Sequence, residues 1–113
     1  ERLITADGLV IGARHFDSPE NGTVGFWVTA IRDRIDEAGG YTLASEETIR
    51  DSSGRSGRLL RLTRQYSERS FNYWIAVFVN NRTVHVVEAG GPTEQFAGHE
   101  TDILNAFCSF DAG

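Results

Sequence analysis

The sequence predicts a single α+β domain in which an antiparallel sheet of six strands lies between two helices, an α-β-α arrangement. The segment Phe71–Val79 has apolar residues on both faces of a strand, which indicates a central strand covered on both sides. The segments 23–38 and 92–110 repeat apolar residues at helical spacing. The predicted strands follow one another through short turns, which favours antiparallel pairing. The predicted order of elements is β-β-α-β-β-β-β-α.

The first third of the chain is expected to form a hairpin and then a helix. Arg2–Ala6 and Leu9–Phe16 are β-favouring runs, and Asp7-Gly8 between them suits a tight turn. Thr23 can cap the following helix, and Gly39-Gly40 can end it. The apolar residues of this helix recur at helical spacing: Val24, Trp27, Val28, Ile31, Ile35 and Ala38.

The middle of the chain predicts three further strands. In Tyr41–Asp51 apolar and polar residues alternate, while Glu46-Glu47 at its centre indicates an edge strand or a bulge. We expect a flexible loop over Ser52–Gly57 and a strand over Arg58–Tyr66. The central strand comes next, and Asn80-Asn81 after it suits a hairpin turn.

The last part of the chain predicts a strand that leads into a helix. Gly90-Gly91 is expected to break the strand Arg82–Ala89, and Pro92 suits the first position of the helix. The helix carries its apolar residues on one stripe: Phe96, Ile103, Leu104, Phe107 and Phe110. Cys108, in the last helical turn, is expected to be a buried core thiol.

Composition limits the classes of function. The chain has 113 residues, which fits one domain spanning residues 1–113. The formal net charge of -5 disfavours a nucleic-acid partner. All 11 cationic residues are Arg, so mechanisms that need lysine are excluded. The chain contains no Met, which leads us to expect that a leader, tether or neighbouring segment precedes Glu1.

Few residues combine into a chemical motif, so we expect no catalytic residues, no metal site and no cofactor. His99 and Asp102 share a helix face and are the only pair that suggests an acid/base function, but a zinc site would need further ligands. His85 and Glu88 should lie on opposite faces of their strand, which excludes a dyad.

Positive charge is concentrated in one stretch. Arg50, Arg55, Arg58 and Arg61 lie in or beside the predicted loop of an otherwise acidic chain. Such asymmetry can steer an acidic partner, so these four arginines are the candidate partner-binding residues. Strand alternation sends Arg58 and Arg64 to one face and Arg61 to the other, and a solvated loop with solvated strand ends is the simpler explanation of the stretch.

Three segments carry a resemblance to a known family. The helix end E-A-G-G-Y-T-L, the loop and strand S-G-R-S-G-R-L-L-R-L, and the hairpin Y-W-I-A-V-F-V-N-N-R-T-V-H-V-V-E-A-G-G-P resemble bacterial envelope proteins of the PsbP-like fold. The resemblance implies an α-β-α sandwich that acts through protein contacts without catalysis. It transfers no site residue to this chain.

The leading hypothesis is therefore a non-catalytic protein-interaction module of the bacterial periplasm or cell envelope, whose contact surface is the arginine-rich loop and the exposed sheet edge. A cytoplasmic location is the alternative, and a membrane would be reached only through a lipid anchor upstream of residue 1. A second hypothesis is a small-molecule or peptide carrier with a groove lined by aromatic residues such as Phe16, Trp27, Tyr66 and Trp74. A third is a small hydrolase-like enzyme that uses His99 and Asp102. Partner identity and oligomeric state stay open.

Overall fold

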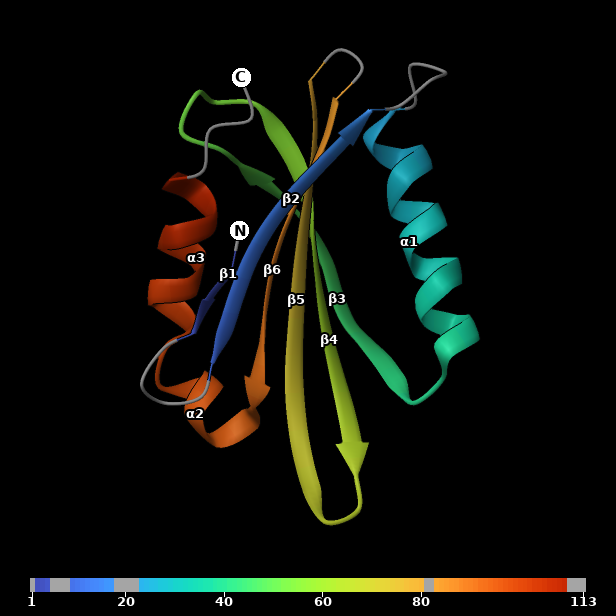
Figure 1. Cartoon of the computed structure of the whole chain (residues 1–113), viewed down its shortest axis with the longest axis vertical. Helices are drawn as coiled ribbons and strands as arrows, with labels where there is room; N and C mark the ends of the chain where they lie inside the picture. Colours follow the sequence, from blue (N-terminus) through green and yellow to red (C-terminus); the bar gives the residue numbers. More distant parts are fainter. Residues whose placement is uncertain (1, 5–8, 18–22, 81–82, 110–113) are drawn as a thin grey trace.

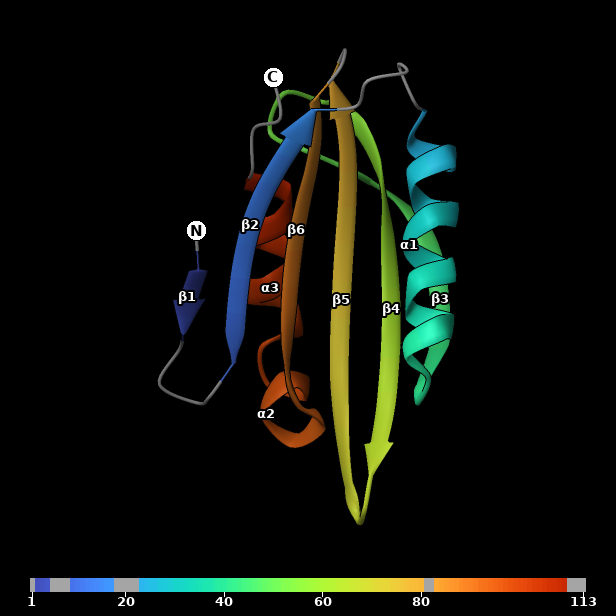
Figure 2. The same ribbon diagram turned by 45° about the vertical axis from the view of Figure 1, so that its right-hand side comes forward.

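The structure is a computed structural model that describes residues 2–4, 9–17, 23–80 and 83–109. These residues form one antiparallel sheet with strand order β1-β2-β6-β5-β4-β3 and helices on both of its faces (Figures 1 and 2). The strands are β1 (Arg2–Ile4), β2 (Val10–Asp17), β3 (Tyr41–Arg50), β4 (Ser56–Tyr66), β5 (Arg69–Asn80) and β6 (Thr83–Pro92). The helices are α1 (Val24–Ala38), α2 (Thr93–Ala97) and α3 (Glu100–Ser109).

The described residues contradict the predicted arrangement of a six-stranded sheet between two helices. The body of the sheet is five long antiparallel strands, β2 to β6, and the edge strand β1 contributes only three residues. Three helices, not two, pack on the sheet. The expected single C-terminal helix is divided because the chain turns at Gly98, where the backbone N–H of His99 bonds to the carbonyl oxygen of Phe96 at 3.0 Å.

The strand predictions differ in their outcomes. β5 lies between β6 and β4, which confirms the central strand. β3 is an edge strand with a register shift between Leu43 and Ser45, so both features expected from its acidic centre are present. The predicted strand break at Gly90-Gly91 is wrong, because β6 continues to Pro92. The opening hairpin is confirmed by the pairing of β1 with β2, whereas Asp7-Gly8, Asn81 and Phe110 lie outside the described residues.

The ends of α1 follow local chemistry. The Thr23 hydroxyl oxygen accepts a hydrogen bond from the backbone N–H of Phe26 at 3.1 Å, which satisfies a donor of the first helical turn. Gly39 ends the helix at φ 74°, and its N–H bonds to the carbonyl oxygen of Ile35 at 3.1 Å. Few other residues adopt this backbone conformation without strain. The cap and the stop predicted from the sequence are both confirmed.

The predicted flexible loop has an ordered backbone centred on Asp51. This carboxylate is 6% exposed and accepts hydrogen bonds from the Ser53 hydroxyl at 2.7 Å and the Arg55 N–H at 2.8 Å. The carbonyl oxygen of Arg55 in turn accepts the N–H of Asp51 at 3.0 Å. Asp51 therefore fixes the turn that leads into β4.

The two faces of the sheet carry separate cores. On one face α2 and α3 bury three phenylalanines completely, Phe78, Phe96 and Phe107. On the other face the buried residues are aliphatic, and Val28 is the one described residue of α1 that is fully buried. The face beneath α2 and α3 is therefore closed by large side chains, while the α1 face is covered only in part.

The position of α1 explains this partial cover. Most of its contacts are with β3, β4 and β5, so β2 is covered less on this face: Arg14 and Phe16 are exposed, whereas Val84 and Val86 of β6 are buried. The β4–β5 hairpin also extends past the C-terminal end of α1 (Figure 1). Two parts of the α1 face are thus open to solvent, one beside the helix and one beyond its end.

Candidate binding groove

A groove lies beside α1, between this helix and β2. It has a volume of about 930 Å³ and is partly open to solvent. Its floor is formed by Tyr73, Ile75 and Val86 of the central strands, and β2 and α1 form its two walls. A volume of this size lies within the usual range for ligand sites. The remaining lining residues are Arg14, Phe16, Trp27, Ala30, Ile31, Asp33, Arg34, Ile35, Glu37, Ala38 and Tyr41.

Aromatic rings form one end of this groove. The ring centroids of Phe16 and Trp27 are 5.1 Å apart in an edge-to-face arrangement, and those of Phe26 and Trp27 are 5.2 Å apart. Phe16 is 36% exposed and Phe26 is 57% exposed. Phe16 and Trp27 line the groove and Phe26 does not, so of the two phenylalanines that contact this indole only one belongs to the groove.

Tyr73 brings a hydroxyl group to the groove floor, and its partner is Glu88, which does not itself line the groove. The Tyr73 hydroxyl donates a hydrogen bond of 2.5 Å to the Glu88 carboxylate from the neighbouring strand. Burial, and then this hydrogen bond, raise the pKa of Tyr73 well above its usual value. Tyr73 therefore stays neutral at physiological pH and keeps donating to Glu88.

A second hollow, here called the tyrosine pocket, lies beyond the end of α1. It has a volume of about 390 Å³ and shares Tyr41 and Tyr73 with the groove. Gly90 forms part of its lining, and its missing side chain leaves the ring of Tyr73 accessible from β6. The other lining residues are Arg64, Tyr66, Phe71, Asn72 and Gly91.

Arg64 is the cationic side chain of the tyrosine pocket. Its guanidinium carbon lies 5.1 Å from the centroid of the Tyr41 ring and 5.9 Å from that of Tyr66. Gly40 gives it room, since a Cβ atom there would lie 3.3 Å from Arg64 Nε. Among the described residues no carboxylate lies within 4.0 Å of Arg64. The guanidinium is therefore held by aromatic faces and is not neutralised by an ion pair.

The arginines predicted to bind a partner make contacts within the protein itself. Arg50 Nη1 donates to the Gly54 carbonyl oxygen at 3.1 Å, and Arg55 Nη1 donates to that of Val79 at 3.4 Å. Both interactions hold the loop against its own strands. They leave these two side chains less available to a partner than the sequence suggested.

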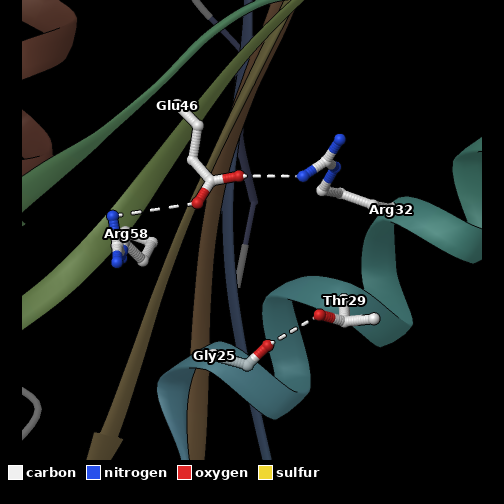
Figure 3. A network of polar contacts seen from close by, with 5 residues as sticks. All are labelled: Gly25, Thr29, Arg32, Glu46 and Arg58. Carbon is white, nitrogen blue, oxygen red and sulfur yellow. Dashed lines mark hydrogen bonds and ion pairs between the residues drawn. The ribbon is translucent and has the colours of Figure 1, made fainter.

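Arg58 and Arg61 lie on opposite faces of β4, as strand alternation predicted. Glu46 accepts Arg32 at 3.2 Å through one carboxylate oxygen and lies 3.7 Å from Arg58 through the other (Figure 3). On the opposite face Arg61 bonds to Glu47 and stacks on Trp74, with 4.3 Å between its guanidinium carbon and the ring centroid. The four predicted arginines therefore form no single cationic surface.

Four other arginines line or border the hollows without a carboxylate partner among the described residues: Arg14, Arg34, Arg64 and Arg69. Arg14 belongs to the groove, and Arg69 stacks over Phe71 with 5.6 Å between its guanidinium carbon and the ring centroid. Sequence reasoning did not select them, because the density of arginine along the chain does not show which ones meet an acidic neighbour. Position on the tyrosine-bearing strand face is the signal that would have separated Arg64 from Arg61.

The predicted aromatic groove is placed in part correctly. Phe16 and Trp27 line the groove, and Tyr66, at 66% exposure, lines the tyrosine pocket. Trp74 lies on the opposite face, where it is 2% exposed and packs edge-to-face on Phe96 at 4.9 Å. Its side chain points away from the groove because Trp74 and Tyr73 are consecutive residues of one strand.

The candidate acid/base pair lies away from both hollows. His99 Nδ1 and Asp102 Oδ2 are 3.6 Å apart at the start of α3, and the Asp102 side chain is 80% exposed. His85 and Glu88 are on opposite faces as predicted, since the His85 ring lies 5.9 Å from that of His15 while Glu88 bonds to Tyr73. Within the described part of the chain, no group of three acidic, histidine or cysteine side chains could hold a metal ion. Cys108 is exposed, so the prediction of a buried thiol is wrong.

Comparisons with known proteins identify the fold alone. No family model matches the chain, and no curated protein sequence matches it. The chain is similar in structure to PA94 from Pseudomonas aeruginosa, a protein of unknown function that has been suggested to be a regulator. The TM-score is 0.78 at 13% sequence identity, over 93% of this chain and 73% of that one. A likeness at this identity supports the arrangement of strands and helices and carries no function.

The predictions that rest on the PsbP-like resemblance remain predictions. They include the family itself, the envelope location and the lipid tether. Among the described residues, no helix is long and apolar enough to cross a membrane.

Proposed function

We propose that the protein is a non-catalytic binding module whose groove along α1 holds an extended peptide segment of a partner protein through apolar side chains. The observation that carries the proposal is the band of partly exposed aromatic side chains that lines the groove between α1 and β2, formed by Phe16, Trp27 and Tyr73. Soluble proteins usually cover such a band or use it for binding. The proposal combines the interaction-module and peptide-carrier hypotheses and moves the contact surface from the arginine-rich loop to the groove.

Three features favour a peptide over an enclosed small molecule. The groove is partly open to solvent, whereas small-molecule sites bury most of the ligand surface. Its lining is rich in tryptophan, tyrosine and arginine, the residue types that dominate binding energy at protein interfaces. Charges of both signs lie around its apolar floor, as in the polar rim of an interface: Arg14, Asp33, Arg34 and Glu37.

The two exposed phenylalanines supply a matched test. Phe16 lines the groove, Phe26 does not, and each contacts Trp27 at nearly the same distance. The probe is a short fluorescein-labelled peptide in which phenylalanine alternates with glutamate, and a peptide with alanine in place of phenylalanine has the same charge. Fluorescence anisotropy measures the affinity of each peptide for the wild-type protein, Phe16→Ala and Phe26→Ala.

We expect the phenylalanine peptide to bind and the alanine peptide to bind much more weakly. Phe16→Ala should lower the affinity about fivefold or more, the effect of losing one anchoring side chain, and Phe26→Ala should change it less than about twofold. Thermal unfolding of both variants controls for folding. Equal affinity for the two peptides, or equal losses in the two variants, would contradict the proposal.

A further inference from the structure

The tyrosine pocket combines an apolar wall with a cation that has no counter-ion among the described residues. Arg64 lies over the rings of Tyr41 and Tyr66, and no carboxylate of the described chain neutralises it. Cation–π contacts orient a guanidinium but leave its N–H donors available to an acceptor. A guanidinium presents a planar fork of donors that matches both oxygens of a carboxylate.

The surroundings of Arg64 make this position selective. The side chain is half-buried, so a carboxylate that reaches it is partly shielded from water. Glu88, the carboxylate partner of Tyr73, lines neither hollow and lies outside the 4.0 Å range of Arg64. An incoming carboxylate would therefore give Arg64 an ion pair. Arg58 and Arg61 already have such pairs, with Glu46 and Glu47 respectively.

The pocket is also joined to the groove. Tyr41 and Tyr73 line both hollows, so a ligand lying along the groove floor can reach Arg64 without leaving the α1 face. Phe71 and Gly90 complete an apolar surface on the other side of the pocket. A ligand that fits both hollows needs an apolar body and an acidic group at one position along it.

We infer that the partner segment is acidic as well as apolar, and that one of its carboxylates binds Arg64 in the tyrosine pocket. This inference rests on the proposed function, because it names the chemistry of the segment that the groove holds. The carboxylate is a side chain or terminus of the peptide. A free aromatic carboxylic acid carries the same chemistry, and the test below distinguishes the two sources.

The test compares arginines on one face of one strand. Arg64→Gln and Arg58→Gln each remove one positive charge from the α1 face of β4, but Arg58 lies beside Glu46 and lines neither hollow. The probes are the phenylalanine–glutamate peptide and its counterpart with glutamine in place of glutamate. A third probe is 3-phenylpropanoate, compared with its amide.

The wild-type protein should bind the glutamate peptide about tenfold more tightly than the glutamine peptide, as expected for one partly shielded charge-assisted contact. Arg64→Gln should reduce this ratio below about twofold, while Arg58→Gln keeps it, because long-range charge changes equally in both variants. If 3-phenylpropanoate shows the same dependence on Arg64 at comparable affinity, the ligand source is a free acid and the peptide assignment is wrong.

Failure of this inference differs from failure of the proposed function. Equal binding of the glutamate and glutamine peptides to the wild-type protein, with both still sensitive to Phe16→Ala, overturns the acidic subsite and leaves the groove intact. A ratio that survives in Arg64→Gln assigns the selectivity to another cation and also overturns the inference. Absence of binding by every peptide overturns both.

Discussion

The two faces of the sheet show how one set of strands can supply both a closed core and an open surface. Beneath α2 and α3, Trp74, Phe78 and Phe96 are at most 2% exposed. On the α1 face, the aromatic rings of Trp27, Tyr41 and Tyr73 remain half-buried and line the two hollows. Consecutive residues of β5 therefore differ in environment: Tyr73 lines the open hollows and Trp74 is buried in the closed core, because strand alternation sends them to different faces.

The same contrast holds for the arginines. Arg61, on the closed face, stacks on a buried tryptophan and pairs with Glu47. Arg64, on the open face, stacks on tyrosines that line a pocket and has no carboxylate partner among the described residues. Arg61 thus completes the cover of its face, whereas Arg64 is positioned for a ligand.

The largest expected effect comes from truncating a phenylalanine on each face. Phe96→Ala empties a site that is 0% exposed, and we expect it to lower the free energy of unfolding by about 3–5 kcal/mol. Phe16→Ala, on the open face, should lower it by less than about 1 kcal/mol because the side chain is already 36% exposed. Urea denaturation measures both values. Similar losses in the two variants would show that the α1 face is packed as tightly as the other.

Adding a methyl group to a glycine makes the next comparison. A Cβ atom at Gly57 would overlap the carbonyl oxygen of Val77 and the ring of Phe78, so Gly57→Ala should cost about 1–3 kcal/mol of unfolding free energy. A Cβ atom at Gly90 would meet Tyr73 Cδ1 at 3.4 Å, an ordinary contact, so Gly90→Ala should change stability by less than about 1 kcal/mol. Denaturation midpoints check the order, and a Gly90→Ala variant as unstable as Gly57→Ala would contradict the open pocket.

Removing one arginine from each face should give a smaller difference. Arg61→Gln loses the contact with Trp74 and the bond to Glu47, for which we expect about 1 kcal/mol of unfolding free energy. Arg64→Gln should cost less than half as much, because its ring contacts are longer and no ion pair is lost. Thermal unfolding of the two variants at low and high salt measures the difference. A larger loss for Arg64→Gln would assign it a structural purpose instead of a binding one.

The smallest expected effect is a dependence of stability on alkaline pH. Burial and the bond to Glu88 raise the pKa of Tyr73 in the folded protein, so folding favours its neutral form. The stability that neutral Tyr73 adds to the folded protein is fully present below about pH 10, where an unfolded tyrosine is also neutral. This stability is lost as the pH rises further. The wild-type protein should therefore lose more stability than Tyr73→Phe above that pH. Parallel curves for the two proteins would show that Tyr73 is solvated like an ordinary surface tyrosine.

Local sequence signals account for most of the elements and for the cap and stop of α1. They account less well for contacts between distant segments. The alternation in β5 predicts that both faces are covered, but it does not show that α1 lies mainly over β3 to β5 and leaves Arg14 and Phe16 of β2 exposed. Cys108 and the division of the last helix at Gly98 were missed for the same reason, since helical spacing does not reveal where the chain turns or how far a helix docks.

The candidate site illustrates this limit. Sequence reasoning selected Phe16, Trp27 and Tyr66 as groove residues, but it also selected Trp74, which is buried on the other face. Strand alternation separates Arg64 from Arg61 but not from Arg58, because that second distinction depends on Glu46 of the paired strand. Register between strands decides which charges are neutralised, and register is fixed only in the folded sheet.

The protein's two tryptophans test the central claim most directly, because Trp27 lines the groove and Trp74 is buried on the opposite face. Their indole N–H resonances can be followed by NMR while the phenylalanine–glutamate peptide is added to the protein. The open-face account predicts that the Trp27 resonance shifts with the binding curve and that the Trp74 resonance stays in place. A shift of Trp74 alone, or binding that moves neither resonance, would contradict it.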